Sequence, residues 1–363
     1  MSFEQSDKPE IDVFTDLEPD DVLALMLLAR FFRFRAVFVV CSENPWWPRL
    51  PLLERLLESL GTRADLVLPI GDDGQPVAAS LRSLEAHFSR QPRRPLIQLA
   101  SFEPLVEIYR SAPQVLSSLD VVAYGSVNIR WALRRSPEQK ELLLGMVHGG
   151  FNSISVFETY FAYGESGNTF NPIDTPRVCS FLSASTHPAC VCLTTCIREW
   201  NESLLSSQAN ALIKHDPETF GCLKHEETGE LVFTGEAMAA LRTAAADRSF
   251  EGFTKARVVL DILRSRESQM VAADPGAAIL AIALFGPQAA WTDDLGAMML
   301  STKAHLRPVR ITIPDAFVVL HEEKGSKVRY FKPDAPGRTF LTMLEDQILS
   351  ILHLALQATV LPV

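Results

Sequence analysis

The chain has 363 residues, a net charge of −10 and a hydrophobic content of 47%. The acidic balance argues against a nucleic-acid partner held by a basic surface. No apolar run reaches the roughly 18 residues that would cross a bilayer, so we expect no membrane partner. The N-terminal residues are polar rather than a signal peptide, and the cysteines lie mostly in apolar runs. These features predict a soluble, cytoplasmic, small-molecule enzyme.

The first strong pattern is a short strand followed at once by an apolar helix. Ile11–Thr15 is rich in β-branched and aromatic residues, and Pro19 opens an apolar run that continues to Ala29. In open α/β sheets, ligands bind where strands end and helices begin. Acidic residues favour a helix N-terminus, and clustered carboxylates also suit a hard divalent cation, so both interpretations are open at this point. The four carboxylates at this junction are Asp16, Glu18, Asp20 and Asp21.

The first half of the chain continues as alternating strands and helices. Continuous apolar runs predict buried parallel strands, and the amphipathic stretches between them predict helices. This alternation predicts an α/β fold with an open, mostly parallel central sheet and helices on both faces. The expected strands are Ala36–Cys41, Leu66–Ile70, Pro95–Ala100 and Leu119–Gly125, and the expected helices are Leu50–Leu60, Ala79–Phe88 and Glu103–Tyr109.

The pattern loosens between residues 126 and 171, where we expect a long loop region on the active-site side with one helix near Ser136–Met146. No linker divides the chain, so we predict a single domain over residues 1–363, with extra C-terminal strands and a closing helix. The later expected elements are helices at Asp174–Leu182, Glu236–Ala246, Thr254–Glu267, Gly276–Phe285 and Thr339–Leu356, a hairpin within Pro217–Val232, and strands at Ala189–Thr195, Val309–Ile313, Phe317–His321 and Lys327–Phe331, the last three as edge strands.

The opening segment TDLEPDDVLALMLLA resembles the N-terminal motif of the inosine-uridine-preferring nucleoside hydrolase superfamily. In that motif a strand ends in Asp, and an Asp pair follows four and five residues later, as Asp16, Asp20 and Asp21 do here. Weaker similarities follow in the family's order and extend over nearly the whole chain. They are carried by AVFVVCSEN, PLIQLASFEPL, VVAYGS, GNTFNPID and AADPGAAILAIAL.

This resemblance implies a nucleoside hydrolase-like fold and a Ca²⁺-dependent hydrolase that splits N-glycosidic bonds in ribonucleosides or related ribosides. It implies that Asp16 is the general base as well as a metal ligand. Trp46 closely follows the implied ribose-binding Asn44, and it could stack on a base or anchor its Pro-flanked loop. Assembly as a homo-oligomer is left open. The other implied metal ligands are Asp21, Asp274 and a backbone carbonyl near Ala100 or Ser101, and the other implied substrate-binding residues are Asp20, Phe170 and Asn171.

The chain departs from the family pattern at several positions, and one of these departures puts the activation of the leaving base in doubt. Phe14 replaces an earlier Asp, Leu17-Glu18 replaces the usual Pro-Gly, and Ala273 replaces a His associated with protonating the leaving base in some members. His148 is a weaker candidate for that missing acid. These departures keep an alternative open, in which a catalytically weak or inactive protein of the same fold binds a nucleoside or an ADP-ribose-like ligand.

Overall fold

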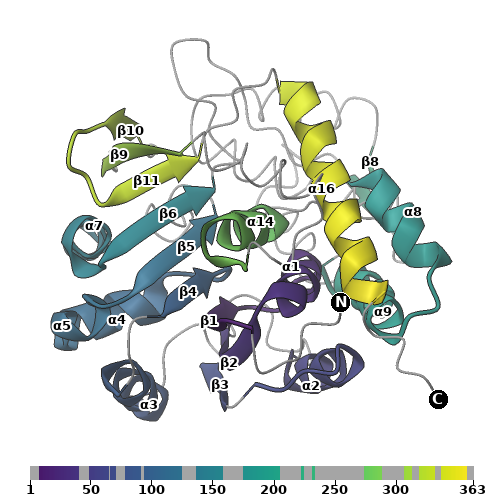
Figure 1. Cartoon of the computed structure of the whole chain (residues 1–363), viewed down its shortest axis with the longest axis horizontal. Coiled ribbons are helices and arrows are strands. Elements are labelled where there is room, and N and C mark those ends of the chain that lie inside the picture. The colour runs from purple at the N-terminus through teal and green to yellow at the C-terminus, as the bar shows by residue number, and fades with distance from the viewer. Residues whose placement is uncertain are drawn as a thin grey trace.

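The computed structural model describes thirteen segments of the chain, which form a 9-stranded sheet, a separate 2-stranded sheet and the helices around them (Figure 1). The segments are residues 8–40, 49–64, 66–70, 78–90, 94–124, 136–157, 175–204, 222–224, 231–233, 274–287, 306–312, 319–331 and 337–357. The strands of the large sheet are β1 (Glu10–Thr15), β2 (Arg33–Val40), β3 (Leu66–Ile70), β4 (Pro95–Gln98), β5 (Asp120–Tyr124), β6 (Ser153–Phe157), β9 (Leu306–Thr312), β10 (Val319–Glu322) and β11 (Val328–Phe331).

The large sheet has the order β10-β9-β11-β6-β5-β4-β1-β2-β3. The seven strands from β11 to β3 are parallel to one another, whereas β9 is antiparallel to both of its neighbours, β11 and β10. The chain winds from β1 outward to β3, then returns to β4 on the other side of β1 and continues to β6. The boundary between β1 and β4 is therefore a topological switch point, where α/β sheets bind ligands beyond the carboxyl ends of their strands.

Helices cover both faces of this sheet, which confirms the predicted fold class. The side chains of the sheet alternate between two apolar cores, one on each face. One face is covered by α1 (Pro19–Phe31), α2 (Arg49–Ser59), α8 (Pro176–Ala184), α9 (Pro188–Leu204), α14 (Asp274–Phe285) and α16 (Gly337–Gln357). The other face is covered by α3 (Ala78–Ser89), α4 (Glu103–Ser111), α5 (Pro113–Leu116), α7 (Pro137–Gly145) and the π-helix η2 (Met146–Gly150).

Two helices at the centre of the first face are buried on nearly every side. In α1 only Asp20 and Arg30 escape burial, and in α14 every residue over 274–283 is buried. The two helices pack against each other, and α16 packs against both (Figure 1). Helices that are apolar all round belong in an interior, so any charge at their N-termini is also held away from water.

The prediction of a strand over Ala189–Thr195 is wrong, because this segment belongs to α9. Cys190, Leu193 and Cys196 are buried at intervals of three residues, while Val191 is 52% exposed. That interval places the buried side chains on one helical face. A short apolar run does not by itself distinguish a strand from a helix, and here Pro188 at the first helical position favours the helix.

The predicted loop region over residues 126–171 contains a strand of the main sheet as well as the expected helix. Strand β6 lies between β5 and β11, so it is an interior strand. Its sequence SISVF does not form a continuous apolar run, because the buried Ser155 interrupts it. The prediction that all three C-terminal strands are edge strands is wrong for β9 and β11, which are interior strands. Only β10 lies at an edge of the sheet.

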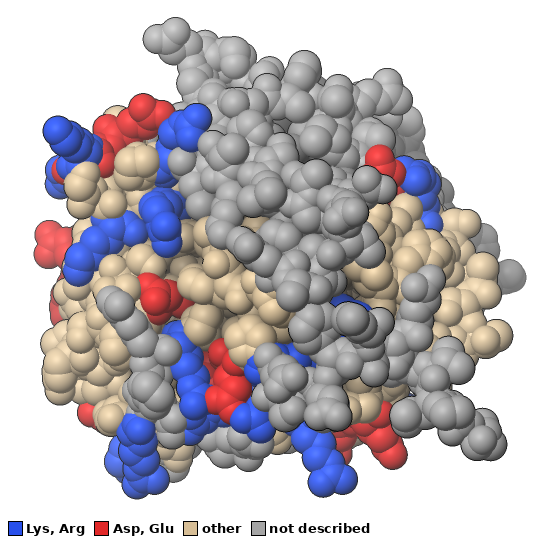
Figure 2. Space-filling view, in the orientation of Figure 1, with Lys and Arg blue, Asp and Glu red and all other residues tan. Residues whose placement is uncertain are grey.

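The expected hairpin within Pro217–Val232 is confirmed by β7 (Cys222–Lys224) and β8 (Leu231–Phe233), which pair in an antiparallel manner. The expected helices at Glu236–Ala246 and Thr254–Glu267 lie outside the described residues. Within the residues that are described, no helix is both long and apolar enough to cross a membrane. Both basic and acidic side chains lie over the region of β9–β11 on the face shown in Figure 2. Arg307 and Arg310 of β9 are exposed.

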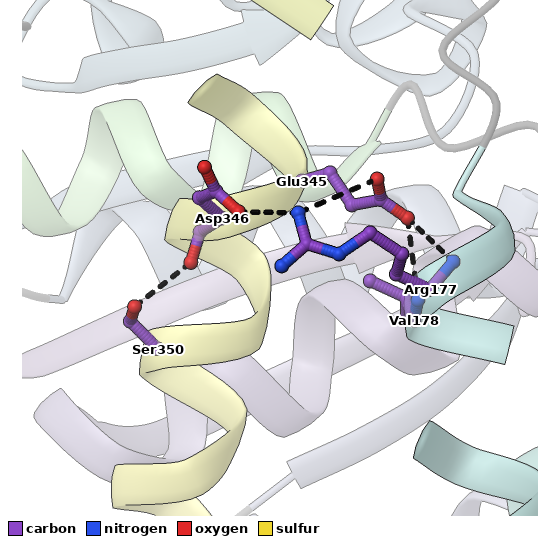
Figure 3. A network of polar contacts seen from close by, with 5 residues as sticks. All are labelled: Arg177, Val178, Glu345, Asp346 and Ser350. Carbon is purple, nitrogen blue, oxygen red and sulfur yellow. Dashed lines mark hydrogen bonds and ion pairs between the residues drawn. The ribbon is translucent and has the colours of Figure 1, made fainter. Parts of the chain in front are cut away.

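A buried carboxylate joins α16 to the N-terminus of α8 (Figure 3). Glu345 Oε1 accepts hydrogen bonds from the backbone N–H groups of Arg177 at 2.7 Å and Val178 at 3.3 Å. The Arg177 guanidinium in turn donates to Asp346 Oδ1 at 2.5 Å. Glu345 is 6% exposed. It therefore satisfies helix-end donors that would otherwise be buried without partners.

Replacing Glu345 with Ala should lower the free energy of unfolding by about 1–2 kcal/mol, because one buried and one part-buried N–H group lose their acceptor. Urea denaturation of the purified protein measures this change. The matched control is Asp346→Ala, which removes a carboxylate that is 47% exposed and should cost at most about 0.5 kcal/mol. Equal losses in the two variants would contradict the capping role.

Candidate metal and substrate site

Three carboxylates meet where the N-termini of α1 and α14 come together. Asp20, Asp21 and Asp274 each offer an oxygen, and these oxygens all lie within 4.8 Å of one another. Asp21 is 1% exposed and Asp274 is 3% exposed, whereas Asp20 is half-buried. Since α1 follows β1, and β1 borders the switch point, the group lies in the region that the topology marks as a binding site.

The β1–α1 turn is built around Asp21. Thr15 Oγ1 donates to Asp21 Oδ1 at 2.6 Å and also accepts from the Leu17 N–H at 3.0 Å. The Glu18 N–H donates to Asp21 Oδ2 at 3.2 Å. Leu17, which is fully buried, adopts a φ of +58°, a left-handed conformation that costs a residue with a side chain roughly 1–2 kcal/mol. The turn thus holds Asp21 rigidly, at the expense of local strain.

Asp20 links the two helices. Its Oδ2 lies 3.5 Å from the backbone N of Asp274, the first residue of α14. This contact places one carboxylate over the positive end of the α14 dipole. Asp274 Oδ1 is itself buried and has no hydrogen-bond partner within the described part of the chain. A buried carboxylate oxygen without a partner is costly, which points to a ligand that completes its coordination.

The carboxylates of Asp21 and Asp274 resist ionisation in the absence of a cation. Burial is the main cause that raises the pKa of each of them well above the usual Asp range. The neighbouring charges act in the same direction, with Asp16 contributing to both shifts. At neutral pH the site therefore favours positive charge, supplied by protons or by a metal ion.

The donor set fits a hard divalent cation. It consists only of carboxylate oxygens, which are the ligands that Ca²⁺ and Mg²⁺ use, and one of these oxygens is buried and unpartnered among the described residues. The group contains no thiolate or imidazole that would favour a softer metal. Asp20, Asp21 and Asp274 are accordingly the residues that could hold such an ion.

The other sequence-predicted residues are distributed as follows. Asp16 directly follows β1, is half-buried, and lies close enough for its charge to raise the pKa of Asp21 and of Asp274, although it is not one of the three grouped above. Ala100 follows β4, the neighbour of β1, and its carbonyl accepts a hydrogen bond from Gln98 Nε2 at 2.9 Å. The predicted residues Asn44, Trp46, Phe170 and Asn171 lie outside the described residues.

Two residues with alternative roles can be assigned. Glu18 forms a capping box with Asp21 at the start of α1, so its place is that of a helix cap. His148 Nε2 lies 2.8 Å from the carbonyl oxygen of Ile311 in β9. Since β9 is separated from β1 by four strands, His148 is not the acid that replaces the family's missing His.

Sequence reasoning missed two polar side chains that shape this edge of the sheet. Thr15 lies on the same face of β1 as Ile11 and Val13, and α1 covers that face. A hydroxyl group in this alternating pattern indicates a buried polar contact. Gln98 is 1% exposed, and its Nε2 holds the β4–α4 turn through the carbonyls of Ala100 and Ser101. No periodicity singles out Gln98, because it ends an otherwise apolar strand.

The raised pKa values of Asp21 and Asp274 predict the pH dependence of stability without metal. Between the unfolded pKa, near 3.8, and the raised folded values, the folded state binds more protons than the unfolded state. Stability therefore falls as pH rises through this window. Denaturation in chelator should show a more stable protein at about pH 5 than at about pH 7.5. Asp274→Asn should flatten this dependence and raise stability at the higher pH.

The matched control for that substitution is Glu54→Gln, which changes an exposed carboxylate on α2 and should leave the pH profile as it is. A stability that rises from the lower to the higher pH in wild-type protein would contradict the prediction. So would an unchanged profile in Asp274→Asn.

No family model and no curated protein sequence matches the chain, but solved structures match it over almost its full length. The type III effector protein XopQ, in complex with adenosine diphosphate ribose, is 13% identical, with a TM-score of 0.52 and coverage of 98% of this chain and 95% of that one. A second effector protein is 12% identical (TM-score 0.51, 95% of each chain), and a plant nucleoside hydrolase is 11% identical (TM-score 0.47, 94% and 98%). The chain therefore shares the α/β fold of these two effector proteins.

Proposed function

We propose that this protein is a Ca²⁺-dependent hydrolase of N-glycosidic bonds in ribonucleosides or related ribosides. The observation that carries the proposal is the buried group of Asp20, Asp21 and Asp274, with the unpartnered Asp274 Oδ1, at the switch point of a nucleoside hydrolase-like fold. Asp16 and the carbonyl of Ala100 would add further oxygens at the same edge of the sheet.

Hydrolysis of such a bond needs a water molecule, side chains that bind the ribose hydroxyls and a base that can leave. The water oxygen forms a bond to the anomeric carbon, the C–N bond breaks with its electron pair going to the base, and the water loses a proton. When bound, Ca²⁺ would supply Lewis-acid chemistry that makes the water more acidic and orients it. Asp16 would accept the proton at its carboxylate. Asp20 would accept a hydrogen bond from a ribose hydroxyl.

The remaining substrate contacts follow from the resemblance. Asn44 and Asn171 would bind sugar oxygens, Phe170 would pack under the ribose, and Trp46 would stack on the base. Ala273 offers no proton to the leaving base, unlike the His that the family often has at this position. We therefore expect turnover to depend strongly on how well the leaving group carries negative charge. A single domain over residues 1–363, a cytoplasmic location and a homo-oligomer stay predictions.

A reducing-sugar assay on a panel of ribosides tests this function. We expect sugar release that requires Ca²⁺, is lost in chelator, and is faster for p-nitrophenyl riboside than for a purine nucleoside, because nitrophenolate leaves without protonation. Asp16→Asn should reduce kcat on the order of 100-fold or more, as removal of a general base does.

The matched control is Asp120→Asn, which changes a carboxylate at the start of β5, the opposite end of a parallel strand from the site. This variant should keep the wild-type turnover. Absence of sugar release from every riboside, in protein that remains folded with Ca²⁺ present, would rule out the hydrolase.

A second candidate is a ligand-binding protein with little or no turnover. Two observations favour it: XopQ, which shares the fold at a TM-score of 0.52, was solved with adenosine diphosphate ribose, and Ala273 replaces the family's His. The ribose and the diphosphate of such a ligand would suit a site that holds a divalent cation, because that cation offsets the charge of its carboxylates.

If binding is the function, ADP-ribose should raise the melting temperature in the presence of Ca²⁺, with no sugar released over the same period. Asp274→Asn should abolish the shift, because it weakens the cation site. Free adenine at the same concentration is the control ligand and should give no shift. A shift that persists unchanged in chelator and in Asp274→Asn would place ADP-ribose elsewhere on the protein.

A further inference from the structure

We propose that Gly276 is a positioning residue for the acidic site. The lack of a side chain at Gly276 lets α14 lie directly against Phe157 of β6, and that contact fixes where Asp274 stands relative to Asp21. The inference rests on the proposed function only in taking these carboxylates as the cation ligands.

The contact between Gly276 and Phe157 leaves no room for a methyl group. A Cβ atom placed on Gly276 would lie 2.0 Å from Phe157 Cε1, 2.2 Å from Cδ1 and 2.7 Å from Cζ. Non-bonded carbons approach each other to about 3.5–4.0 Å, so an alanine would require a displacement of roughly 1.5 Å. The other helical glycines among the described residues do not approach an aromatic ring this closely.

The ring of Phe157 is buried and stacked on a second ring, which limits its freedom to turn aside. Phe157 is 1% exposed, and its ring stacks on that of Phe331 in β11, with centroids 5.3 Å apart and an interplanar angle of 16°. Both residues are the last of their strands, and the two strands pair in parallel register. Close-packed interiors transmit such displacements instead of absorbing them. The strain of a larger side chain at Gly276 would therefore move the helix.

Movement of α14 would act directly on the site. Asp274 is two residues before Gly276 in the same helix, and Asp20 and Asp21 stand on α1, which packs beside it. Ligand distances in a metal site are tolerated to only about 0.2 Å. A shift several times larger would separate Asp274 from Asp21 without changing any carboxylate.

If Gly276 acted only through its own helix, replacing it with Ala would stabilise α14 and would not displace it. Within a helix, Gly is less favourable than Ala by about 1 kcal/mol, so Gly→Ala at a position with free space stabilises the helix. Gly149 offers that comparison, because a Cβ there would meet nothing within 4 Å. Both substitutions add one methyl group to a helical glycine, but only the methyl group at position 276 meets a ring.

Calorimetric titration with Ca²⁺ alone tests the inference in the full-length protein. Gly276→Ala should weaken Ca²⁺ binding on the order of 10–100-fold, the range expected when ligand positioning is lost. Gly149→Ala should bind as wild type does. Adding Phe157→Val to Gly276→Ala removes the ring that the methyl group meets, and should restore most of the affinity. Wild-type affinity in Gly276→Ala, or a loss that Phe157→Val does not reverse, would overturn the proposal.

A second measurement separates this inference from the proposed function. If wild-type protein binds no Ca²⁺, the metal-dependent function fails. The position of Asp274 is then tested by a double-mutant cycle of Asp21→Asn and Asp274→Asn in chelator, which measures the coupling between the two carboxylates in the free energy of unfolding. The non-additivity of the two substitutions should fall by more than half in the Gly276→Ala background. Non-additivity that stays the same would overturn the role of Gly276, whatever the ligand of the site.

Discussion

The repulsion between buried carboxylates is the constraint on which the rest of this structure depends. Asp21 and Asp274 are both nearly inaccessible to solvent, and their oxygens stand within 4.8 Å of a third carboxylate, Asp20. Burial raises the cost of every negative charge in this group. The protein offsets part of that cost with the Thr15 hydroxyl and with backbone N–H groups from two helix N-termini. The remainder requires a positive charge that the described residues do not supply.

The packing of the first face follows from this requirement. For two helix N-termini to meet at one point, α1 and α14 have to lie side by side against the sheet, and both are built almost wholly from apolar and small residues. Gly276 allows the closest approach to the sheet, and α16 covers the pair from outside. The same requirement affects the backbone of the β1–α1 turn. Leu17 adopts a left-handed conformation there, and the tight turn lets Asp21 reach Thr15.

Periodicity in the sequence predicts most of this fold, and motif spacing predicts part of the site. The strands near the switch point are rich in apolar residues, and Asp16, Asp20 and Asp21 are recognisable because they are local in sequence. The pattern fails where tertiary context decides. Ser155 interrupts an interior strand, and the apolar run after Pro188 satisfies helix and strand periods about equally well. The role of Gly276 depends on a contact with Phe157, over a hundred residues away, which no local pattern reveals.

Binding and turnover make different physical demands on this site. The charge of the buried carboxylates has to be offset by protons or by a cation whether or not a bond is broken, so binding of a cation here would be tied to the folded state itself. In the proposed hydrolase, turnover would also need the half-buried Asp16 as a proton acceptor and a route for a proton to the leaving base. Cation binding would depend on the packed helices α1 and α14, whereas turnover would depend on Asp16 and on the residue type at position 273. Under this proposal, loss of turnover would leave the fold and the group of Asp20, Asp21 and Asp274 intact, whereas loss of that group would change the energetics of the core.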